Sequence, residues 1–199
     1  MGAPSRRGSC AIGHTRYPVG NCSVAVAAGR RRPTSAPRST LHEDLVSLVS
    51  ALDGIQQSPR YHPEGDALYH SLQVFQLAQR ESADRVMWAA ALFHDVGKAI
   101  DGPSHDEVGA DLLEGLLPPR AVWLVRHHLD LMKDPRRTRR RYGELPIMRE
   151  LQQLRRWDER GRDPKARVMS LHQALDALYA GQPRELFLDL DGTFDPEER

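Results

Sequence analysis

The sequence has no long hydrophobic run, no excess of either charge and almost no cysteine. No apolar segment approaches the ~20 residues that a membrane-spanning helix needs, so we expect no membrane partner. Lys and Arg number 28 against 27 Asp and Glu, a net charge of +1, so no global field draws the chain to nucleic acid or membrane. Cys10 and Cys22 both lie near the N-terminus, away from the candidate core. A reducing, cytoplasmic setting fits this composition.

The chain also lacks any sustained two-residue alternation with β-branched residues, which argues against a sheet. Apolar residues instead recur at helical spacing, and we expect helices over residues 41–53, 66–81, 84–94, 105–116, 119–132, 145–159 and 164–180. A chain of 199 residues that is 40% hydrophobic suits one domain with tails. The predicted fold class is all-α, a single bundle of six to seven helices.

Residues 1–39 predict a disordered, Arg-rich tail, because they hold seven Arg, no acidic residue and many Gly, Pro, Ser and Ala. An organelle transit peptide has a similar bias, as does translated upstream sequence in a GC-rich bacterial genome, which we favour. A secretory signal does not fit, because the apolar segment 24–28 is too short. We expect the folded domain at residues 40–181 and an acidic tail at 182–199.

The segment His94-Asp95-Val96-Gly97-Lys98 directly follows an apolar run, residues 88–93. A histidine and a carboxylate do not belong beside an apolar core unless something pairs with them. A divalent cation is the simplest such partner, since imidazole and carboxylate together suit Mn, Fe, Ni, Co or Zn. The alternative is a plain helix end, with Gly97 as a left-handed cap and Lys98 facing the negative end of the helix dipole.

Further candidate ligands are spread over the other predicted helices: His70, His105, His127, His128 and Asp158. Each has a plain alternative as a solvated or hydrogen-bonded residue. Asp158, for example, can pair with a neighbouring Arg or Lys. His127 and His128 are about a quarter-turn apart on a helix, so one of them is free to point to water. Spacing does not say which of the two is the ligand.

Taken together, the pattern His70 … His94-Asp95 … Asp158 resembles that of the HD-domain metal-dependent phosphohydrolases, an all-α family. The resemblance runs from about Leu41 to about Leu178. Residues 61–70, Tyr-His-Pro-Glu-Gly-Asp-Ala-Leu-Tyr-His, look like the segment before the first metal-binding His in the HD domain of bacterial CCA-adding tRNA nucleotidyltransferases. Residues 104–110 look like the segment that follows the His-Asp pair there. Nothing upstream looks like a nucleotidyltransferase head, so we expect a free-standing HD domain.

The resemblance implies one or two divalent ions, with Mn, Fe, Co, Ni, Mg and Zn as the candidates. The first ion would be held by two imidazoles and two carboxylates that leave positions for water and substrate, namely His70, His94, Asp95 and Asp158. In two-metal members of the family the Asp of the His-Asp pair bridges the ions. Histidines on the next two helices then hold the second ion, here His105 with one or both of His127 and His128.

The activity that the resemblance implies is hydrolysis of a phosphate ester or anhydride, on a nucleotide or another small molecule. The metal would lower the pKa of a bound water molecule, and the resulting hydroxide would attack phosphorus. Asp95 would also hold or orient the nucleophile, and Lys98 would neutralise phosphate charge. We interpret the turn at residues 62–65, His-Pro-Glu-Gly, as structural, with Glu64 favoured near a helix N-terminus.

A regulatory or RNA-associated HD module, which keeps the metal site but turns over little, is the alternative function. The arginines between residues 136 and 141 support it, because a basic loop can grip an RNA backbone or a polyphosphate. We rank a solvated loop balanced by Asp134 and Glu144 slightly ahead, so an RNA partner is not favoured. The sequence chooses neither the substrate, nor the native metal, nor the oligomeric state.

Overall fold

The computed structural model describes residues 41–180 and 194–197. Within these residues the chain forms nine α-helices, one 3-10 helix and no strand, which confirms the predicted all-α class. The tail expected at residues 1–39, and most of the one expected at 182–199, lie outside the described residues. In the described part, none of the helices combines the length and the apolar character that crossing a bilayer requires.

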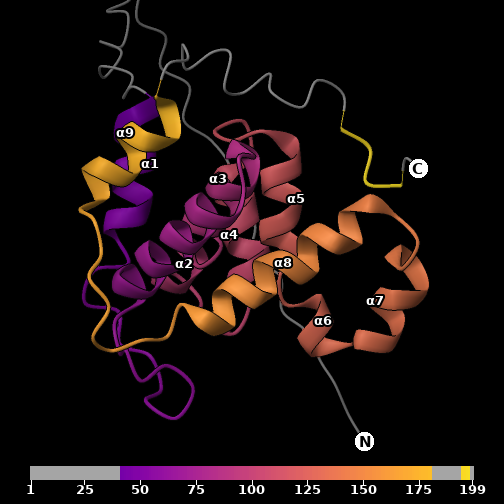
Figure 1. The fold of residues 1–199 in the computed structure, drawn as a ribbon, viewed down its shortest axis with the longest axis horizontal. Coiled ribbons are helices and arrows are strands. Elements are labelled where there is room, and N and C mark those ends of the chain that lie inside the picture. The colour runs from indigo at the N-terminus through magenta and orange to yellow at the C-terminus, as the bar shows by residue number, and fades with distance from the viewer. Residues whose placement is uncertain (1–40, 181–193, 198–199) are drawn as a thin grey trace, which may run out of the picture. The chain divides into compact units, whose positions relative to one another are not determined.

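Two helices form the centre of the bundle, α2 (Ala67–Glu81) and the shorter α3 (Arg85–Phe93) (Figure 1). α1 (Leu41–Ser50) and α9 (Leu171–Tyr179) pack together on one side, and α8 (Pro146–Arg160) packs against α2 and α3. α4 (His105–Leu113) and α5 (Pro119–His127) form the remaining side. Buried apolar side chains gather in two clusters, one around Phe93 and Leu175 and one around Leu154 and Trp157.

Side-chain caps fix where the central helices begin. The Asp66 carboxylate accepts hydrogen bonds from the backbone N–H groups of Tyr69 and Gly54, both at 2.8 Å, and Asp84 accepts from Val86 at 2.9 Å. These bonds satisfy N–H groups that have no partner inside the helix. The two caps therefore place the start of α2, which carries His70, and of α3, which leads to His94.

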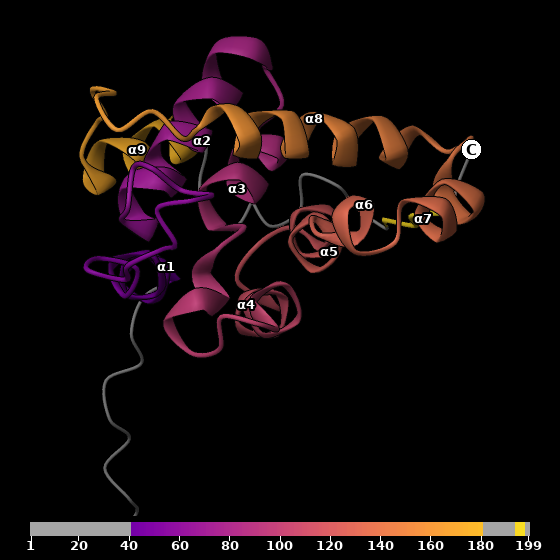
Figure 2. The same ribbon diagram turned by 90° about the horizontal axis from the view of Figure 1, so that it is seen from below.

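Two predictions about the second half of the chain are wrong. The stretch 133–143, expected as a loop, forms α7 (Pro135–Tyr142), and the helix expected over 119–132 is divided into α5 and α6 (Asp130–Lys133). Figure 2 shows α7 beside the N-terminal end of α8. Asp134 caps α7 by accepting from the Arg137 N–H at 2.9 Å, and Thr138 and Tyr142 turn inward one helical turn apart. The bundle therefore has more than the six to seven helices expected.

The last helix begins later than predicted. Residues 164–170 are not helical, and α9 starts after Ser170, whose hydroxyl accepts from the Gln173 N–H while the Gln173 side chain accepts from the Ser170 N–H. This reciprocal capping box is a stronger start signal than the apolar spacing that extends upstream of it. Residues 164–170 therefore form a non-helical connection between α8 and α9, with a turn at residues 164–165.

A short 3-10 helix, η1 (Val96–Ala99), follows the His-Asp pair and packs against α4. Gly97 is not the left-handed cap of the alternative reading, because it is not among the glycines with positive φ. It is required for space: a Cβ at this position would lie 2.2 Å from the His105 carbonyl oxygen and 2.7 Å from the Gly109 nitrogen. This close approach brings Asp95 next to α4.

Candidate metal centre

Four histidines and one aspartate meet at the centre of the bundle, and all are buried. The exposed fractions are 0% for His70, 1% for His94 and Asp95, 8% for His105 and 6% for His128. They come from α2, from the ends of α3 and α5, and from the first turn of α4. Burying so many polar side chains costs free energy unless each of them has a partner.

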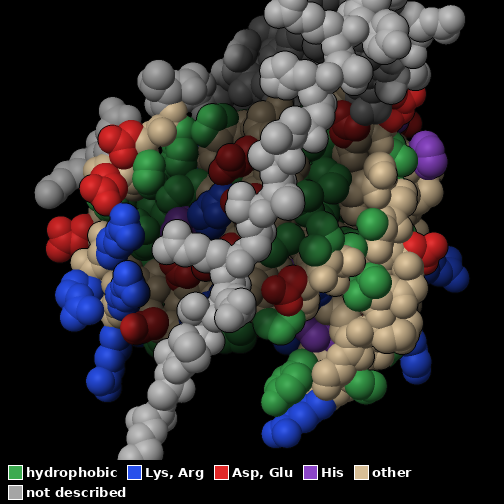
Figure 3. Space-filling model, turned by 180° about the vertical axis from the view of Figure 1, so that it is seen from behind, with side chains coloured by type: hydrophobic (Ala, Val, Ile, Leu, Met, Phe, Trp, Pro, Cys, Tyr) green, Lys and Arg blue, Asp and Glu red, His purple; other side chains and the backbone are tan. Residues whose placement is uncertain are grey.

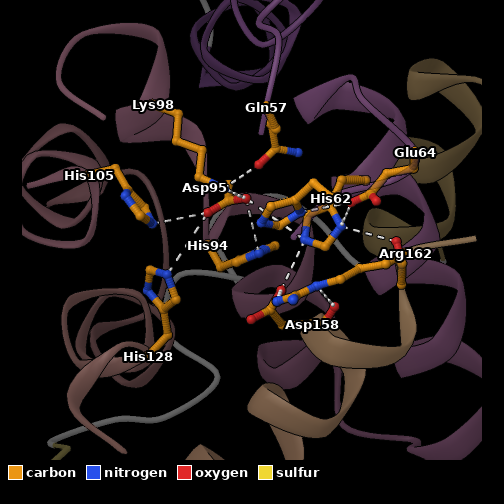
Figure 4. A network of polar contacts seen from close by, with 12 residues as sticks. Gln57, His62, Glu64, His94, Asp95, Lys98, His105, His128, Asp158 and Arg162 are labelled. Carbon is orange, nitrogen blue, oxygen red and sulfur yellow. Dashed lines mark hydrogen bonds and ion pairs between the residues drawn. The ribbon is translucent and has the colours of Figure 1, made fainter. Parts of the chain in front are cut away.

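Asp95 lies between two groups of imidazoles. Its Oδ2 atom is 3.3 Å from His94 Nε2 and 3.8 Å from His70 Nε2, whereas its Oδ1 atom is 3.2 Å from His105 Nε2 and 3.9 Å from His128 Nε2. Figure 4 shows His105 and His128 together on one side of the Asp95 carboxylate. Asp95 forms one group of three candidate ligands with His70 and His94, and another with His105 and His128. Within each group the ligand atoms lie within 4.8 Å of one another. One carboxylate thus offers an oxygen to each of two histidine pairs.

All four imidazoles are oriented in the same way. In each ring the Nδ1 atom lies within hydrogen-bond distance of a backbone carbonyl oxygen. That oxygen belongs to Gly161 for His70 and to Ala91 for His94, both at 3.0 Å. It belongs to Gly102 for His105 and to Val125 for His128, both at 2.6 Å. A carbonyl only accepts, so Nδ1 carries a proton in each ring, and Nε2 is the nitrogen that faces Asp95.

The Nε2 atoms of His94 and His128 are buried and have no hydrogen-bond partner among the described residues. Metal-binding histidines characteristically donate one ring N–H to a carbonyl or carboxylate and use the other nitrogen as ligand. Buried lone pairs that converge on a shared carboxylate therefore fit a divalent cation, and the mixed nitrogen and oxygen donors suit Mn, Fe, Co, Ni or Zn.

Asp158 of α8 closes the His70 side of the cluster. Its Oδ1 atom is 3.1 Å from His70 Nε2 and 2.9 Å from the Arg162 guanidinium. Burial by itself raises the pKa of Asp158, but the hydrogen bond with His70 and the nearby imidazoles outweigh it and hold the pKa well below its usual range. Asp158 is therefore ionised and adds negative charge to the centre.

The electrostatics of the buried cluster favour a cation. Burial disfavours a charged His70, yet hydrogen bonds with Asp158 and Glu64 raise its pKa to about 9. Burial, together with the charges of His128 and His70, lowers the pKa of His94 to about 3 despite the nearby Asp95, so its imidazole is neutral at pH 7. The carboxylates that attract a proton to His70 attract a metal ion for the same reason.

Lys98 reaches the same centre from η1. Its Nζ atom is 2.6 Å from Asp95 Oδ2 and 2.5 Å from the side-chain oxygen of Gln57. A cavity of about 320 Å³ opens over the cluster and is lined by Asp95, Lys98 and Arg162 and also by Tyr61, His62, His105, His128, Leu129, Met132 and Asp158. The cluster is therefore accessible to a small ligand that approaches between two cationic side chains.

The structure separates the two neighbouring histidines that spacing left undecided. His128 lies in the cluster, whereas His127 Nδ1 is 2.8 Å from Asp130 Oδ2 and its ring packs 4.3 Å from the Trp123 ring, measured between centroids. His127 lines a different cavity, of about 360 Å³, beside α7. The ligand set proposed below therefore includes His128 and leaves out His127.

Sequence reasoning missed three polar residues of the site, and Glu64 is the most buried of them. Its side chain is fully buried, with Oε1 2.8 Å from the Nδ1 atoms of both His62 and His70. The interpretation of the 62–65 turn as structural therefore overlooked its link to the first candidate ligand. An acidic residue two positions from a histidine was the available signal. For Arg162 the available signal was its i+4 spacing from Asp158. For Gln57 the sequence offers no such signal.

A model of the HD domain matches residues 67–178, and the chain belongs to this family. Curated relatives are each called "Multifunctional CCA protein". The one from Halorhodospira halophila is 39% identical over 101 residues, which cover 43% of this chain and 24% of the relative. Those from Hahella chejuensis and Xanthomonas campestris pv. campestris are 37% identical over 81 residues and 31% identical over 141 residues. The last alignment covers 60% of this chain and 34% of the relative, so the chain spans only part of these proteins.

Proposed function

We propose that this chain is a divalent-metal-dependent phosphohydrolase that acts on a nucleotide or another small phosphate ester or anhydride. The observation that supports it most is the Asp95 carboxylate, whose two oxygens face two pairs of buried imidazole Nε2 atoms. Membership of the HD-domain family, a superfamily of metal-dependent phosphohydrolases, supports the same reaction class.

The proposed ligands of one ion are His70, His94, Asp95 and Asp158, and those of a second ion are Asp95, His105 and His128. When bound, such ions acidify a water molecule and polarise a phosphoryl oxygen. The backbone carbonyls on the Nδ1 side keep each imidazole in one tautomer and one orientation, so the donor atoms are arranged before the ligand arrives.

Lys98 and Arg162 are proposed to hold the phosphate group. Both line the cavity, and both have a carboxylate partner there, Asp95 for Lys98 and Asp158 for Arg162. A phosphate oxygen at the mouth of the cluster can take a hydrogen bond from either side chain, and an ionised acceptor makes such bonds strong. Asp95 also orients the attacking water by accepting a hydrogen bond from it.

The cavity favours a small substrate. Its volume of about 320 Å³ lies near the lower end of the range for small-molecule sites. Tyr61 and Met132, which are 58% and 61% exposed, stand at its rim and present apolar surface for a base or another organic group. A single phosphorylated unit therefore suits the site better than a bulky folded substrate.

The experiment is to replace Asp95 with Asn and to measure bound metal and phosphate release from a nucleotide panel with Mn, Co, Ni and Mg in turn. We expect the variant to lose at least about 100-fold in turnover and most of its metal, because Asp95 faces both histidine pairs. Asp130→Asn is a matched control, since its carboxylate contacts His127 outside the cluster. Full turnover in Asp95→Asn would contradict the proposal.

The regulatory or RNA-associated module remains the second candidate, because the exposed arginines of α7 are a specific feature that hydrolysis of a small substrate does not use. Wild-type protein that retains metal but releases no phosphate from any member of the panel would favour this candidate over the enzyme.

A further inference from the structure

The surface of α7 is strongly basic. Five of the six residues from 136 to 141 are arginines, and all five are exposed. Among the described residues, only Arg141 of these five forms an ion pair, a 3.4 Å contact with the exposed Glu197. The remaining four guanidinium groups face solvent without a carboxylate partner in the described part of the chain.

The balance expected from Asp134 and Glu144 is absent. The Asp134 carboxylate caps α7 through the Arg137 N–H, and Glu144 forms no ion pair within the residues that the structure describes. Like charges three and four residues apart on one helix repel each other, and α7 contains several such pairs, for example Arg136 with Arg140. The helix therefore carries an unfavourable charge pattern that a bound polyanion would relieve.

The basic surface continues from α7 onto α8. Between residues 136 and 156 there are eight arginines against two glutamates. Arg139 lines a groove of about 580 Å³ together with Arg155 and Arg156 of α8, and Glu159, which pairs with Arg155 at 2.9 Å, lines it too. Figure 3 shows Lys and Arg side chains gathered along the edge of the molecule where α7 lies. We call this surface of α7 and α8 the arginine face.

On its other side, the arginine face borders a cavity between α7 and the residues around His127. Arg137 and Arg141 line the cavity of about 360 Å³ beside α7. Four carboxylates line the same cavity, those of Asp106, Glu107, Asp130 and Asp134, so the cavity carries mixed charge.

We propose that the arginine face binds the phosphate backbone of single-stranded RNA. Guanidinium groups suit phosphates because their fork of N–H donors matches two phosphate oxygens. The four unpaired guanidinium groups lie on a helix of eight residues, so they span only a few successive phosphates, which one strand supplies. RNA is the nucleic acid that occurs mainly as single strands in cells.

An acidic protein partner fits this surface less well. Protein interfaces usually contain apolar or aromatic anchors at their centre. Among the described residues the exposed large hydrophobic side chains are Tyr61, Ile100 and Met132, and none of them lies on α7 or α8. Charge without such anchors is what recognition of a phosphate backbone requires.

The test measures binding of a fluorescently labelled single-stranded RNA of about 12 nucleotides, within the range of single-strand sites, by fluorescence anisotropy. The full chain is compared with R137Q/R139Q/R140Q and with a control, R80Q/K165Q/R167Q, which loses the same charge. Arg80 and Arg167 line a separate cavity near α2, and none of the residues that line it also lines the cavities beside the arginine face. Glutamine keeps a helix propensity close to that of arginine, so α7 should persist.

We expect the arginine-face variant to bind RNA at least about tenfold more weakly than wild type near 100 mM salt. The slope of log K against log salt concentration should also be smaller in magnitude by about 2, since each of the three lost phosphate contacts contributes ~0.7. The control should match wild type in both quantities. Melting temperature and hydrolysis of a small phosphate ester check that each variant is folded. If the triple variant does not fold, R140Q alone should reduce the slope by about 0.7.

Three results would overturn the inference: no RNA binding by wild type at low salt, equal losses in both triple variants, or equally tight binding of an oligo-glutamate of the same charge. Duplex RNA that binds as tightly as the single strand would refute the preference for single strands. The assay needs no hydrolysis, so its outcome is independent of the proposed phosphohydrolase activity.

Discussion

Gly97→Ala is the substitution whose effect the structure defines most directly. The added Cβ would lie 2.2 Å from the carbonyl oxygen of His105 and 2.7 Å from the nitrogen of Gly109. Both obstacles are backbone atoms at the start and middle of α4, so no side chain can turn aside. Either η1 or α4 must move, and the separation of Asp95 Oδ1 from His105 Nε2, now 3.2 Å, must grow.

We expect Gly97→Ala to destabilise the fold by about 2–3 kcal/mol, the upper part of the range for overpacking, because backbone must shift. For a chain of this size that lowers the melting temperature by roughly 5–10 °C. Metal bound per chain should fall as well, since the two pairs of proposed ligands move apart.

The matched control is Gly102→Ala, because a Cβ at Gly102 meets no heavy atom within 4 Å. Both variants can be followed by thermal unfolding, monitored by circular dichroism, and by elemental analysis of the purified protein. A Gly97→Ala protein that melts with the wild type and retains its metal would refute the argument that this close approach holds η1 against α4.

Four further predictions concern the centre and its surroundings. His128→Ala should lose metal and activity whereas His127→Ala should retain both, as measured by metal content and turnover. Glu64→Gln should weaken metal affinity by about 10–100-fold, because the carboxylate no longer holds His70 Nδ1; titration of the metal-free protein measures this, and an unchanged affinity would exclude the role. Removing metal with a chelator should lower the melting temperature, and adding Mn should restore it. At a Mn concentration about 100 times the dissociation constant, the free energy of unfolding should rise by about 2.7 kcal/mol. Glu81→Gln should destabilise the fold by roughly 1 kcal/mol at pH 7, since Glu81 accepts from the Trp157 indole at 2.9 Å. That hydrogen bond, helped by Arg160, lowers the pKa of Glu81 from 4.5, so the difference from wild type should persist above pH 4.5 and vanish as the pH falls further below it; a constant difference in acid unfolding would contradict this.

Local signals in the chain were sufficient for most of the helices. Apolar spacing placed α2 and α3, and the caps that the structure shows at Asp66 and Asp84 are local too, because capping depends only on residues close together in the chain. The same reasoning failed for α7, where a run of arginines looked like a solvated loop. Asp134 and Pro135 were a local start signal for this helix, and the burial of Thr138 and Tyr142 against the rest of the bundle adds to it.

The residue types of the candidate site were also readable from the chain, because histidines and aspartates on several helices matched a family pattern. Their neighbours were not. Glu64 contacts His70 across a turn, and Gln57 contacts Lys98 from 41 positions away, so no local spacing reveals that second contact. The choice between His127 and His128 depends on how α5 is rotated against α3 and α4, which packing sets.

The order of the amino acids thus specified an all-α chain, its central helices and a set of possible metal ligands, since helix periodicity and capping act over a few residues. Which imidazoles converge on Asp95, and where the arginines of α7 lie relative to them, depended on contacts between helices far apart in the chain. Those contacts are decided by side-chain volume and by backbone approach, as at Gly97, and become visible only once the helices are packed.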